Sequence, residues 1–491
     1  MKTALLFLSF LSCLICTFPA SAKHLQRKPR IDQYFASASP DEKLAFLFAM
    51  PKGADLDMEI SGSAYAESIM ASAAKKGLCL DNTLALQAPP CKEDQIPASK
   101  LLSDPVLQRH MLDAWSFPES QGTDRDRFFR TLGRFAMATH GMEGELLAKM
   151  ASRAARDHVM YLEVEVEPDD GADALGKRLG WDGHFVNTLH NLQNNGISKI
   201  VQSATKTIKD FESEKNKRLK CGMQDADPGC MVAIGYLYGI DRTALPGEVF
   251  AKMETGLELA SMPNSGFSGI LLKGEEDQAV KDFNLHMQML DFLKNLHPKA
   301  HVAVNAGELT PELATPEDLS FHVSEAVMLG HAQRIGSGSD IMFEVPDLPG
   351  KLAKMKVLVD ICPSRIRAVL GDGSDALRLY LKHGVPVAIS SCDGGLLRSE
   401  LSPEYLKAST LDDLSYENLK RIARDSLEHS FLPGRSLWVN AEKFTPVRQC
   451  ERDVIVGRML NSFCQDYLEA NRKAKLEWQL ETEFKAFEKR Y

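Results

Sequence analysis

The sequence predicts a (β/α)₈ barrel of the TIM type, and two observations lead to this fold class. After residue 50, eight short apolar, strand-like segments alternate with helix-like segments. The chain has 491 residues, which is enough to bury one large core with extensions around it. A doubly wound open sheet shows the same alternation, so the sequence leaves that topology as an alternative.

The predicted strands are mostly apolar runs rich in Val, Ile and Leu, which is typical of parallel strands buried on both faces. Helix-like segments such as 279–295 and 318–330 lie between them. About a hundred residues separate the first strand from the second, so we expect a helical insertion there. The strands are expected at residues 54–60, 159–166, 230–240, 267–272, 301–307, 334–336, 356–362 and 385–391.

The amino terminus has the pattern of an export signal over residues 1–22. Lys2 precedes an apolar run from Ala4 to Phe18, and small residues at 20–22 form a cleavage site. The apolar run is too short for a membrane-spanning helix. We therefore expect an exported protein, periplasmic or secreted, with no membrane attachment once the signal is removed.

We divide the remaining chain into three parts. Residues 23–45 form a basic amino-terminal arm, residues 46–445 form the barrel, and residues 446–491 form a carboxy-terminal helical extension. The amphipathic pattern from Cys464 to the end predicts one long helix that packs on the barrel exterior.

Cysteine spacing also favours an oxidising compartment. Three pairs of cysteines lie close together in loop-like sequence, which suits local disulfides. Cys362 and Cys392 instead lie in apolar runs, and we expect Cys362 to be a small buried apolar residue. The expected pairs are Cys79 with Cys91, Cys221 with Cys230, and Cys450 with Cys464.

The charge balance excludes one class of partner. The chain carries a formal net charge of −9 and has no basic patch in its barrel region. Such a chain is not expected to bind nucleic acid or an anionic membrane surface.

Polar residues occur at the carboxyl ends of the predicted strands, where a (β/α)₈ barrel carries its working residues. Asp57 and Glu59 are two residues apart, so on a strand their side chains face the same side. Each strand-end residue alone has an ordinary explanation, such as a turn, but together they predict a site at one mouth of the barrel. The others are Asn305, Glu308, Ser337, Cys392 and Asp393.

Several long blocks of sequence resemble, in order, the bacterial exported branch of the adenosine deaminase family, in the metal-dependent hydrolase superfamily. They are MPKGADLDMEISGSAYAE, HVAVNAGELTPELATPEDLSFHVSEAVMLGHAQRIGSGSDI and GVPVAISSCDGGLLRSELSPEYL. The chain is also similar to the secreted adenosine-deaminase-related growth factors. The resemblance implies a zinc-dependent barrel that hydrolyses the 6-amino group of adenosine, giving inosine and ammonia.

At the positions that bind zinc in the family, this sequence carries other residues. The family has His-x-His where this chain has Asp57 and Glu59, a histidine at Asn305, and an aspartate at Cys392. The family's water-orienting histidine corresponds to Ser337. The resemblance therefore implies that the zinc ligands are all substituted and that zinc is absent or replaced.

Two residues of the family's site remain. Glu308 matches the proton shuttle that faces purine N1, and Asp393 matches the residue that contacts N7. The resemblance thus implies that both are substrate-binding residues, with Glu308 also catalytic.

Three hypotheses follow from these substitutions. In the first, the protein is an exported pseudoenzyme that binds a purine nucleoside or a protein partner. In the second, it is an active hydrolase with a metal-free carboxylate site, or with Mg²⁺, Mn²⁺ or Ca²⁺ bound by Asp57, Glu59 and Asn305. The third is a secreted interaction protein with a vestigial pocket. We favour the first, because Ser337 cannot replace a histidine base near neutral pH and an amide oxygen is a poor zinc ligand.

Overall fold

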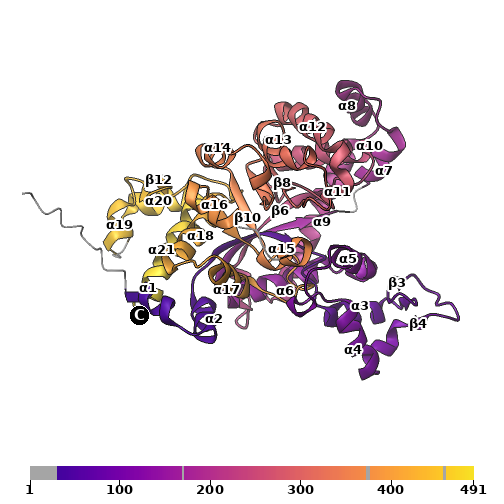
Figure 1. The fold of residues 1–491 in the computed structure, drawn as a ribbon, viewed down its shortest axis with the longest axis horizontal. Coiled ribbons are helices and arrows are strands. Elements are labelled where there is room, and N and C mark those ends of the chain that lie inside the picture. Colours follow the sequence, from indigo (N-terminus) through magenta and orange to yellow (C-terminus); the bar gives the residue numbers. More distant parts are fainter. Residues whose placement is uncertain (1–29, 169–170, 372–375, 457–459) are drawn as a thin grey trace, which may run out of the picture.

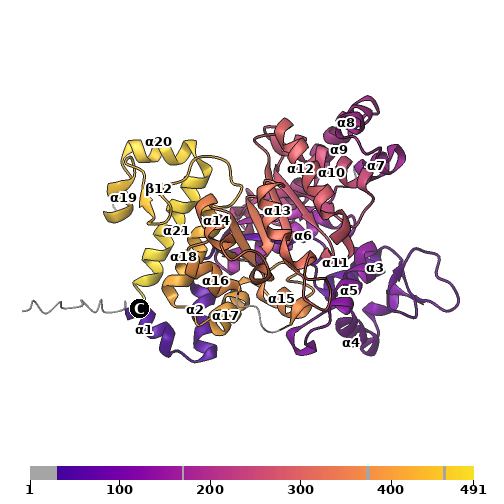
Figure 2. The ribbon, with the colours of Figure 1, turned by 45° about the horizontal axis from the view of Figure 1, so that its top comes forward.

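The computed structural model describes residues 30–491 apart from 169–170, 372–375 and 457–459. The predicted export signal lies outside the described residues. At the centre, eight parallel strands form one curved sheet in sequence order, as Figures 1 and 2 show. The strands are β1 (Gly53–Glu59), β5 (Val159–Val166), β6 (Ala233–Asp241), β7 (Phe267–Lys273), β8 (His301–Ala306), β9 (Arg334–Ser337), β10 (Leu358–Ile361) and β11 (Val387–Ile389).

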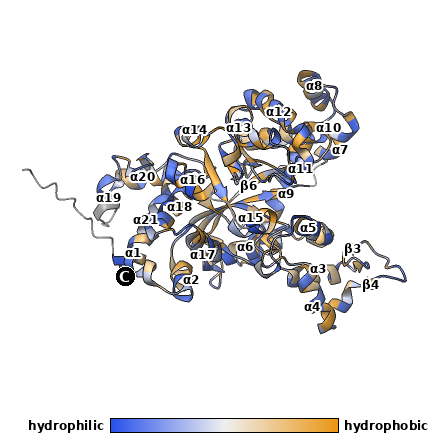
Figure 3. Cartoon of the chain, in the orientation of Figure 1, coloured by the Kyte–Doolittle hydropathy of each residue, from blue (hydrophilic) through white to orange (hydrophobic). Residues whose placement is uncertain are grey.

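The sheet closes into a nearly complete barrel. Met58 on β1 forms a parallel bridge with Cys392, which follows the last strand β11. The predicted (β/α)₈ barrel and all eight predicted strands are confirmed, and the doubly wound alternative is wrong because the first and last strands meet. In Figure 3 the barrel strands are largely hydrophobic, as expected for strands buried on both faces.

Helices surround the barrel, at least one after each strand, as a (β/α)₈ fold requires. Their apolar faces pack on the strands and form one continuous core. They are α7 (Ala172–Leu179), α8 (Phe185–Asn194), α9 (Ile197–Arg218), α10 (Pro246–Ser261), α11 (Glu276–Ala279), α12 (Phe283–Leu296), α13 (His322–Met328), α14 (Leu348–Met355), α15 (Pro363–Leu370), α16 (Ala376–His383), α17 (Leu401–Leu411) and α18 (Tyr416–Glu428).

The segment between β1 and β5 forms the expected helical insertion, which projects from the barrel in Figure 1. It also contains a small antiparallel sheet that the sequence did not predict. The predicted disulfide between Cys79 and Cys91 is present and links this sheet to the loop that follows β3. Its elements are α3 (Ala66–Lys75), β2 (Cys79–Leu80), β3 (Leu86–Gln87), β4 (Ile96–Pro97), α4 (Pro105–Ala114), α5 (Arg125–Thr139) and α6 (Glu143–Arg156).

The two ends of the described chain lie on the same side of the barrel (Figure 1). The amino-terminal end forms two helices, α1 (Arg30–Ser37) and α2 (Pro40–Ala49), so part of the segment expected as an arm is helical. Phe46 of α2 packs against Phe487 and Tyr491 near the carboxyl end. The carboxy-terminal elements are β12 (Trp438–Asn440), β13 (Thr445–Pro446), α19 (Glu451–Val456), α20 (Ser462–Ala470) and α21 (Arg472–Glu488).

The prediction of one long carboxy-terminal helix is wrong, because the chain breaks between α20 and α21 at Asn471. Asn471 has an extended backbone, and its side-chain oxygen accepts a hydrogen bond from the Arg435 nitrogen at 2.8 Å. The predicted Cys450–Cys464 and Cys221–Cys230 disulfides are both present. Among the described residues, no helix is both long enough and apolar enough to cross a membrane.

A buried ion pair holds the start of β1, the strand that carries Asp57 and Glu59. Lys52 is fully buried, and its Nζ lies 3.3 Å from a carboxylate oxygen of Asp157, at the end of α6. The backbone nitrogen of Ser402 in α17 also donates to Asp157, at 2.9 Å. Burial lowers the pKa of Lys52 to about 8, and Asp157 opposes that decrease.

Replacing Asp157 with alanine should destabilise the fold strongly, because it leaves Lys52 buried without its counter-charge. We expect the free energy of unfolding in urea to fall by about 3–5 kcal/mol. In a control variant, Asp210→Ala removes one partner of the exposed Lys206–Asp210 pair, and its change should stay within about 1 kcal/mol. Equal losses in the two variants would contradict the role assigned to the buried pair.

Candidate functional site

The residues predicted at the strand ends come together at the carboxyl end of the barrel. Asp57 and Glu59 lie on β1, and Asn305 and Ser337 lie on the neighbouring strands β8 and β9. Cys392 follows β11 and bridges back to the residue between Asp57 and Glu59. The predicted convergence therefore follows from the closure of the barrel.

Two of these positions have an unusual backbone. Ser337 has φ of 74° and Cys392 has φ of 49°, in the left-handed region that residues other than glycine seldom adopt. Such conformations cost on the order of 1–3 kcal/mol each and cluster at functional sites. The hydroxyl of Ser337 lies 2.9 Å from that of Ser339, so this serine forms a hydrogen bond within its own loop.

Arg365 dominates the centre of the site, although the sequence reasoning did not single it out. It lies in the first turn of α15, directly after β10. Its Nε and Nη2 atoms contact the two carboxylate oxygens of Glu308 at 3.0 Å and 3.2 Å, and its Nη1 contacts Asp393 at 2.9 Å. The guanidinium also lies over the rings of Phe128 and Phe129, 5.5 Å and 5.6 Å from their centroids. One arginine thus pairs with both Glu308 and Asp393.

The carboxylate of Asp393 is enclosed by protein. Burial raises the pKa of Asp393 to about 7, with a further contribution from Glu59, and Arg365 opposes the rise. Its Oδ1 atom has no hydrogen-bond partner and lies against Gly62, where an added Cβ would be only 2.0 Å away. A residue larger than glycine at position 62 would therefore displace this carboxylate.

Cys392 is joined to Cys362 by a disulfide, and the Cα atoms of the two residues are 6.2 Å apart. The expectation that Cys362 is only a small buried apolar residue is therefore wrong. The two residues follow adjacent strands, which sequence distance alone does not reveal. Asp57 lies beside this disulfide, with one carboxylate oxygen 3.4 Å from the sulfur of Cys392.

Asp57 has negative and positive neighbours inside the barrel. Burial raises the pKa of Asp57 to about 7, Asp360 on β10 adds to the rise, and Arg365 and Arg334 oppose it. Burial likewise raises the pKa of Asp360 to about 7, while Arg334 opposes it. Arg334 also pairs with the fully buried Glu163 of β5.

Glu59 belongs to a different ion cluster at the edge of the mouth. One of its oxygens lies 3.4 Å from Lys273 Nζ and 3.0 Å from the Ser61 hydroxyl. Lys273 also contacts Glu165 at 3.3 Å and Glu167 at 3.0 Å. Burial raises the pKa of Glu165 to about 8. Burial acts in the same direction on Glu167, but the positive charges of Lys273 and Lys252 outweigh it and lower the pKa of Glu167 to about 2.

A cavity of about 160 Å³ adjoins this cluster, and Lys273, Glu165, Glu167, Ser61 and His140 are among its lining residues. Neither Glu308 nor Asp393 lines it. Its volume is below the range of about 300–1,000 Å³ that is usual for small-molecule sites.

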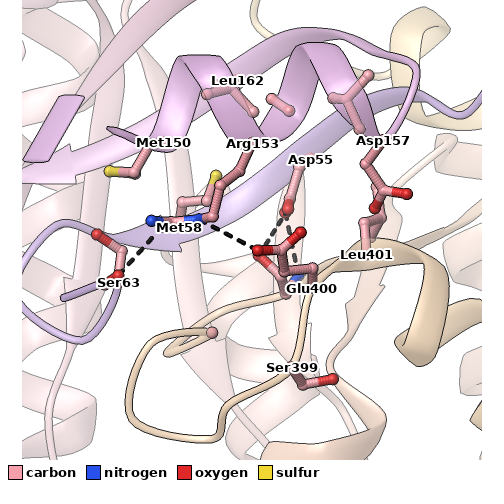
Figure 4. A pocket seen from close by; sticks show the side chains of 14 residues that line it. Asp55, Met58, Ser63, Met150, Arg153, Asp157, Leu162, Ser399, Glu400 and Leu401 are labelled. Atoms are coloured by element: carbon pink, nitrogen blue, oxygen red, sulfur yellow. Dashed lines mark hydrogen bonds and ion pairs between the residues drawn. The ribbon is translucent and has the colours of Figure 1, made fainter. Parts of the chain in front are cut away.

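A smaller pocket lies between β1, α6 and the loop before α17 (Figure 4). Its volume is about 30 Å³, enough for a single water molecule. Asp55 lies at this pocket and accepts hydrogen bonds from the backbone and hydroxyl of Ser391, at 3.1 Å and 2.6 Å. Arg153 spans the pocket between the Ser63 carbonyl and Glu400. These contacts hold the loop that carries Cys392 and Asp393.

Among the described residues, one group of three His, Cys, Asp or Glu side chains is arranged so that it could hold a metal ion. It consists of Asp57, Cys362 and Cys392, whose ligand atoms lie within 4.8 Å of one another. The other expected ligands have different surroundings. Glu59 faces Lys273, and the side-chain oxygen of Asn305 is buried without a hydrogen-bond partner.

A family model described as adenosine deaminase matches residues 136–437, more than half of the chain. Together with the barrel, this match defines a deaminase-type (β/α)₈ protein. The chain belongs to the adenosine deaminase family.

Individual relatives are distant. Over 119 residues the chain is 32% identical to an aminodeoxyfutalosine deaminase of Streptomyces coelicolor, and the match covers 23% of this chain and 30% of that protein. The chain thus spans less than a third of that relative's length.

Two solved structures share the fold. The N6-methyl-AMP deaminase of Arabidopsis thaliana gives a TM-score of 0.51 at 16% identity, over 79% of this chain and 94% of that one. An Arabidopsis protein crystallised with GMP gives a TM-score of 0.50 at 15% identity, over 79% of this chain and 94% of that one.

The raised pKa values predict how stability depends on pH. An aspartate in the unfolded chain has a pKa near 3.9, whereas Asp57, Asp360 and Asp393 have values of about 7 in the fold. Between these values the folded protein binds more protons than the unfolded chain, so the contribution of these groups to stability is lost as pH rises through 7. We expect Asp57→Asn to reduce the loss of unfolding free energy between pH 5 and pH 8.

Urea unfolding at several pH values measures the free energy of unfolding as a function of pH. Each unit by which the pKa of a group differs between the folded and unfolded states corresponds to about 1.4 kcal/mol. Asp347→Asn, in an exposed helical pair with Lys351, is the matched control and should leave the pH profile unchanged. Parallel profiles for wild type and Asp57→Asn would contradict the prediction.

Proposed function

We propose that this chain is an exported member of the adenosine deaminase family that does not hydrolyse adenosine through a zinc ion. The pairing of Arg365 with both Glu308 and Asp393 carries the proposal. In the family these two carboxyl groups face the purine, whereas here both are engaged by a buried guanidinium.

The residues at the family's zinc positions do not fit zinc. Cys392 has no free thiolate while it is joined to Cys362, and Asn305 offers only a neutral amide. Glu59 is paired with Lys273, so a cation near it would compete with an ammonium group. Of the four positions, this leaves Asp57 as the one available anionic ligand. One carboxylate is too few to hold a zinc ion.

Basic side chains replace the charge that a metal ion would supply. Carboxylates taken out of water are stable only when they are paired or protonated. Arg365 and Lys273 contact buried carboxylates at the barrel mouth, and Arg334 contacts Glu163 deeper in the barrel. These ion pairs explain how an acidic barrel mouth is stable without a metal, and they disfavour Mg²⁺, Mn²⁺ or Ca²⁺ at Asp57, Glu59 and Asn305.

Export is supported by the amino-terminal pattern at residues 1–22 and by disulfide use. All eight cysteines after that segment are paired, in four disulfides. Disulfides persist in oxidising compartments and are rare in the cytosol. The periplasm and the extracellular space are equally compatible with this reasoning.

A purine nucleoside ligand is the second candidate function. Glu308 and Asp393 match the family's purine contacts, and a structural neighbour was crystallised with GMP. Binding in the family's manner requires that Arg365 release at least one of the two carboxylates. We therefore rank this candidate below the main proposal.

An active hydrolase with a metal-free site is the remaining alternative. Asp57, Asp360 and Asp393 all have pKa values raised to about 7, which suits acid–base chemistry. However, burial of the three carboxyl groups inside the barrel already accounts for the raised pKa values without a catalytic role.

Metal analysis and a deaminase assay on the purified protein, with its disulfides intact, test the main proposal. We expect far less than one zinc per chain and no conversion of adenosine to inosine above the uncatalysed rate, measured by absorbance. A zinc-bound family member with an intact His-x-His motif is the positive control. One zinc per chain together with rapid turnover would falsify the proposal.

Calorimetric titration with adenosine and inosine tests the second candidate. We expect no saturable heat for the wild-type protein, because Arg365 engages the two carboxylates that would contact the base. A saturable isotherm that disappears in Asp393→Ala and persists in Asp347→Ala would instead establish a retained purine site.

A further inference from the structure

We propose that the Cys362–Cys392 disulfide masks a metal site, which two thiolates and Asp57 form once a dithiol reduces the bond. The site differs from the family's histidine site in its donors, and Cys362 lies outside the family's ligand set. The proposal concerns metal binding by the reduced protein, so it does not depend on nucleoside binding.

The geometry of the three side chains suits one metal ion. Cys362 and Cys392 follow the adjacent strands β10 and β11, and Asp57 comes from β1 on the other side of the barrel closure. Their ligand atoms lie within 4.8 Å of one another. Zinc–sulfur bonds of about 2.3 Å place two tetrahedral thiolate ligands about 3.8 Å apart. With Cα atoms 6.2 Å apart, side-chain rotation alone can reach this spacing.

The donor set defines the class of metal. Two thiolates and one carboxylate favour Zn²⁺ or a similar thiophilic ion over Mg²⁺ or Ca²⁺, which require oxygen donors. Three protein ligands leave the fourth tetrahedral position for water, as in open zinc sites.

The surrounding charges favour a cation after reduction. Asp57 already experiences repulsion from Asp360 and from Glu59. Reduction gives two neutral thiols, and loss of their protons would add two negative charges at the same point. A divalent ion would therefore relieve repulsion that the disulfide form avoids.

The electrons and protons exchanged during reduction and metal binding balance. A dithiol donates two electrons to the disulfide by thiol–disulfide exchange, and becomes a disulfide itself while Cys362 and Cys392 become thiols. Metal binding then displaces one proton from each thiol. In the reverse direction, exchange with a small-molecule disulfide takes two electrons from the two cysteines, restores the Cys362–Cys392 bond, leaves the small molecule as a dithiol and releases the ion.

This disulfide differs from the other three in the chain. In the other three, the two cysteines are separated in sequence by 12, 9 and 14 positions. In this one the separation is 30 positions, and the disulfide joins two strand ends at the barrel mouth. Among the described residues, it alone has a carboxylate placed to complete a three-ligand group. A purely structural role does not require that carboxylate.

Cobalt titration tests the proposal, because Co²⁺ bound by thiolates gives a sulfur-to-metal absorption band. The full mature chain is reduced with dithiothreitol, desalted without oxygen, and titrated with Co²⁺ and then Zn²⁺. We expect one cobalt per chain with a thiolate band, displaced by zinc, in the reduced protein and none in the oxidised protein. Asp57→Asn should retain the band and weaken binding at least about tenfold.

Matched variants separate this site from the other reduced cysteines. Cys362→Ser and Cys392→Ser should each lose the high-affinity cobalt ion, whereas the double variant Cys221→Ser/Cys230→Ser should retain it. Circular dichroism establishes that each variant is folded, and either single serine variant is sufficient for the test.

Equal cobalt binding by reduced wild type and reduced Cys362→Ser would overturn the proposal, as would a reduced wild-type protein that binds no cobalt. Zinc-dependent turnover by the oxidised protein would contradict the proposed function alone, so the two failures are distinguishable.

Discussion

Compensation of buried negative charge is the constraint on which the barrel mouth depends. Parallel strands that end at one mouth bring several carboxylates together, and these are costly to bury without counter-charge. In this chain Arg365 pairs with Glu308 and Asp393 across the mouth, and Lys273 pairs with Glu165 at its edge. Arg334, at the amino end of β9, pairs with Glu163 deeper in the barrel. The ion pairs therefore stabilise the carboxylates that the closure of the barrel brings together.

The backbone around the site is strained at two positions. Ser337 and Cys392 both lie in left-handed conformations. Such strain persists only where surrounding contacts enforce it, and here Asp55 and the Met58 bridge hold the loop after β11. Contacts from β1 therefore hold the strained backbone that follows β11.

The barrel could be predicted because its signal is local and repeated. Each of the eight strands is an apolar run, and the strand assigned to 159–166 matches β5 residue for residue. The three local disulfides were predictable for the same reason, since their cysteines are close in sequence. The break at Asn471 was missed because both helices share one amphipathic pattern, and the break depends on a contact with Arg435.

The sequence by itself determined the alternation of strands and helices and the family to which the chain belongs. Only the tertiary structure decided which side chains pair with the buried carboxylates at the barrel mouth. Arg365 lies 57 residues from Glu308 and 28 from Asp393, and Cys362 lies 30 from Cys392. No sequence pattern encodes these contacts, because closure of the barrel, which brings distant strand ends to one mouth, creates them.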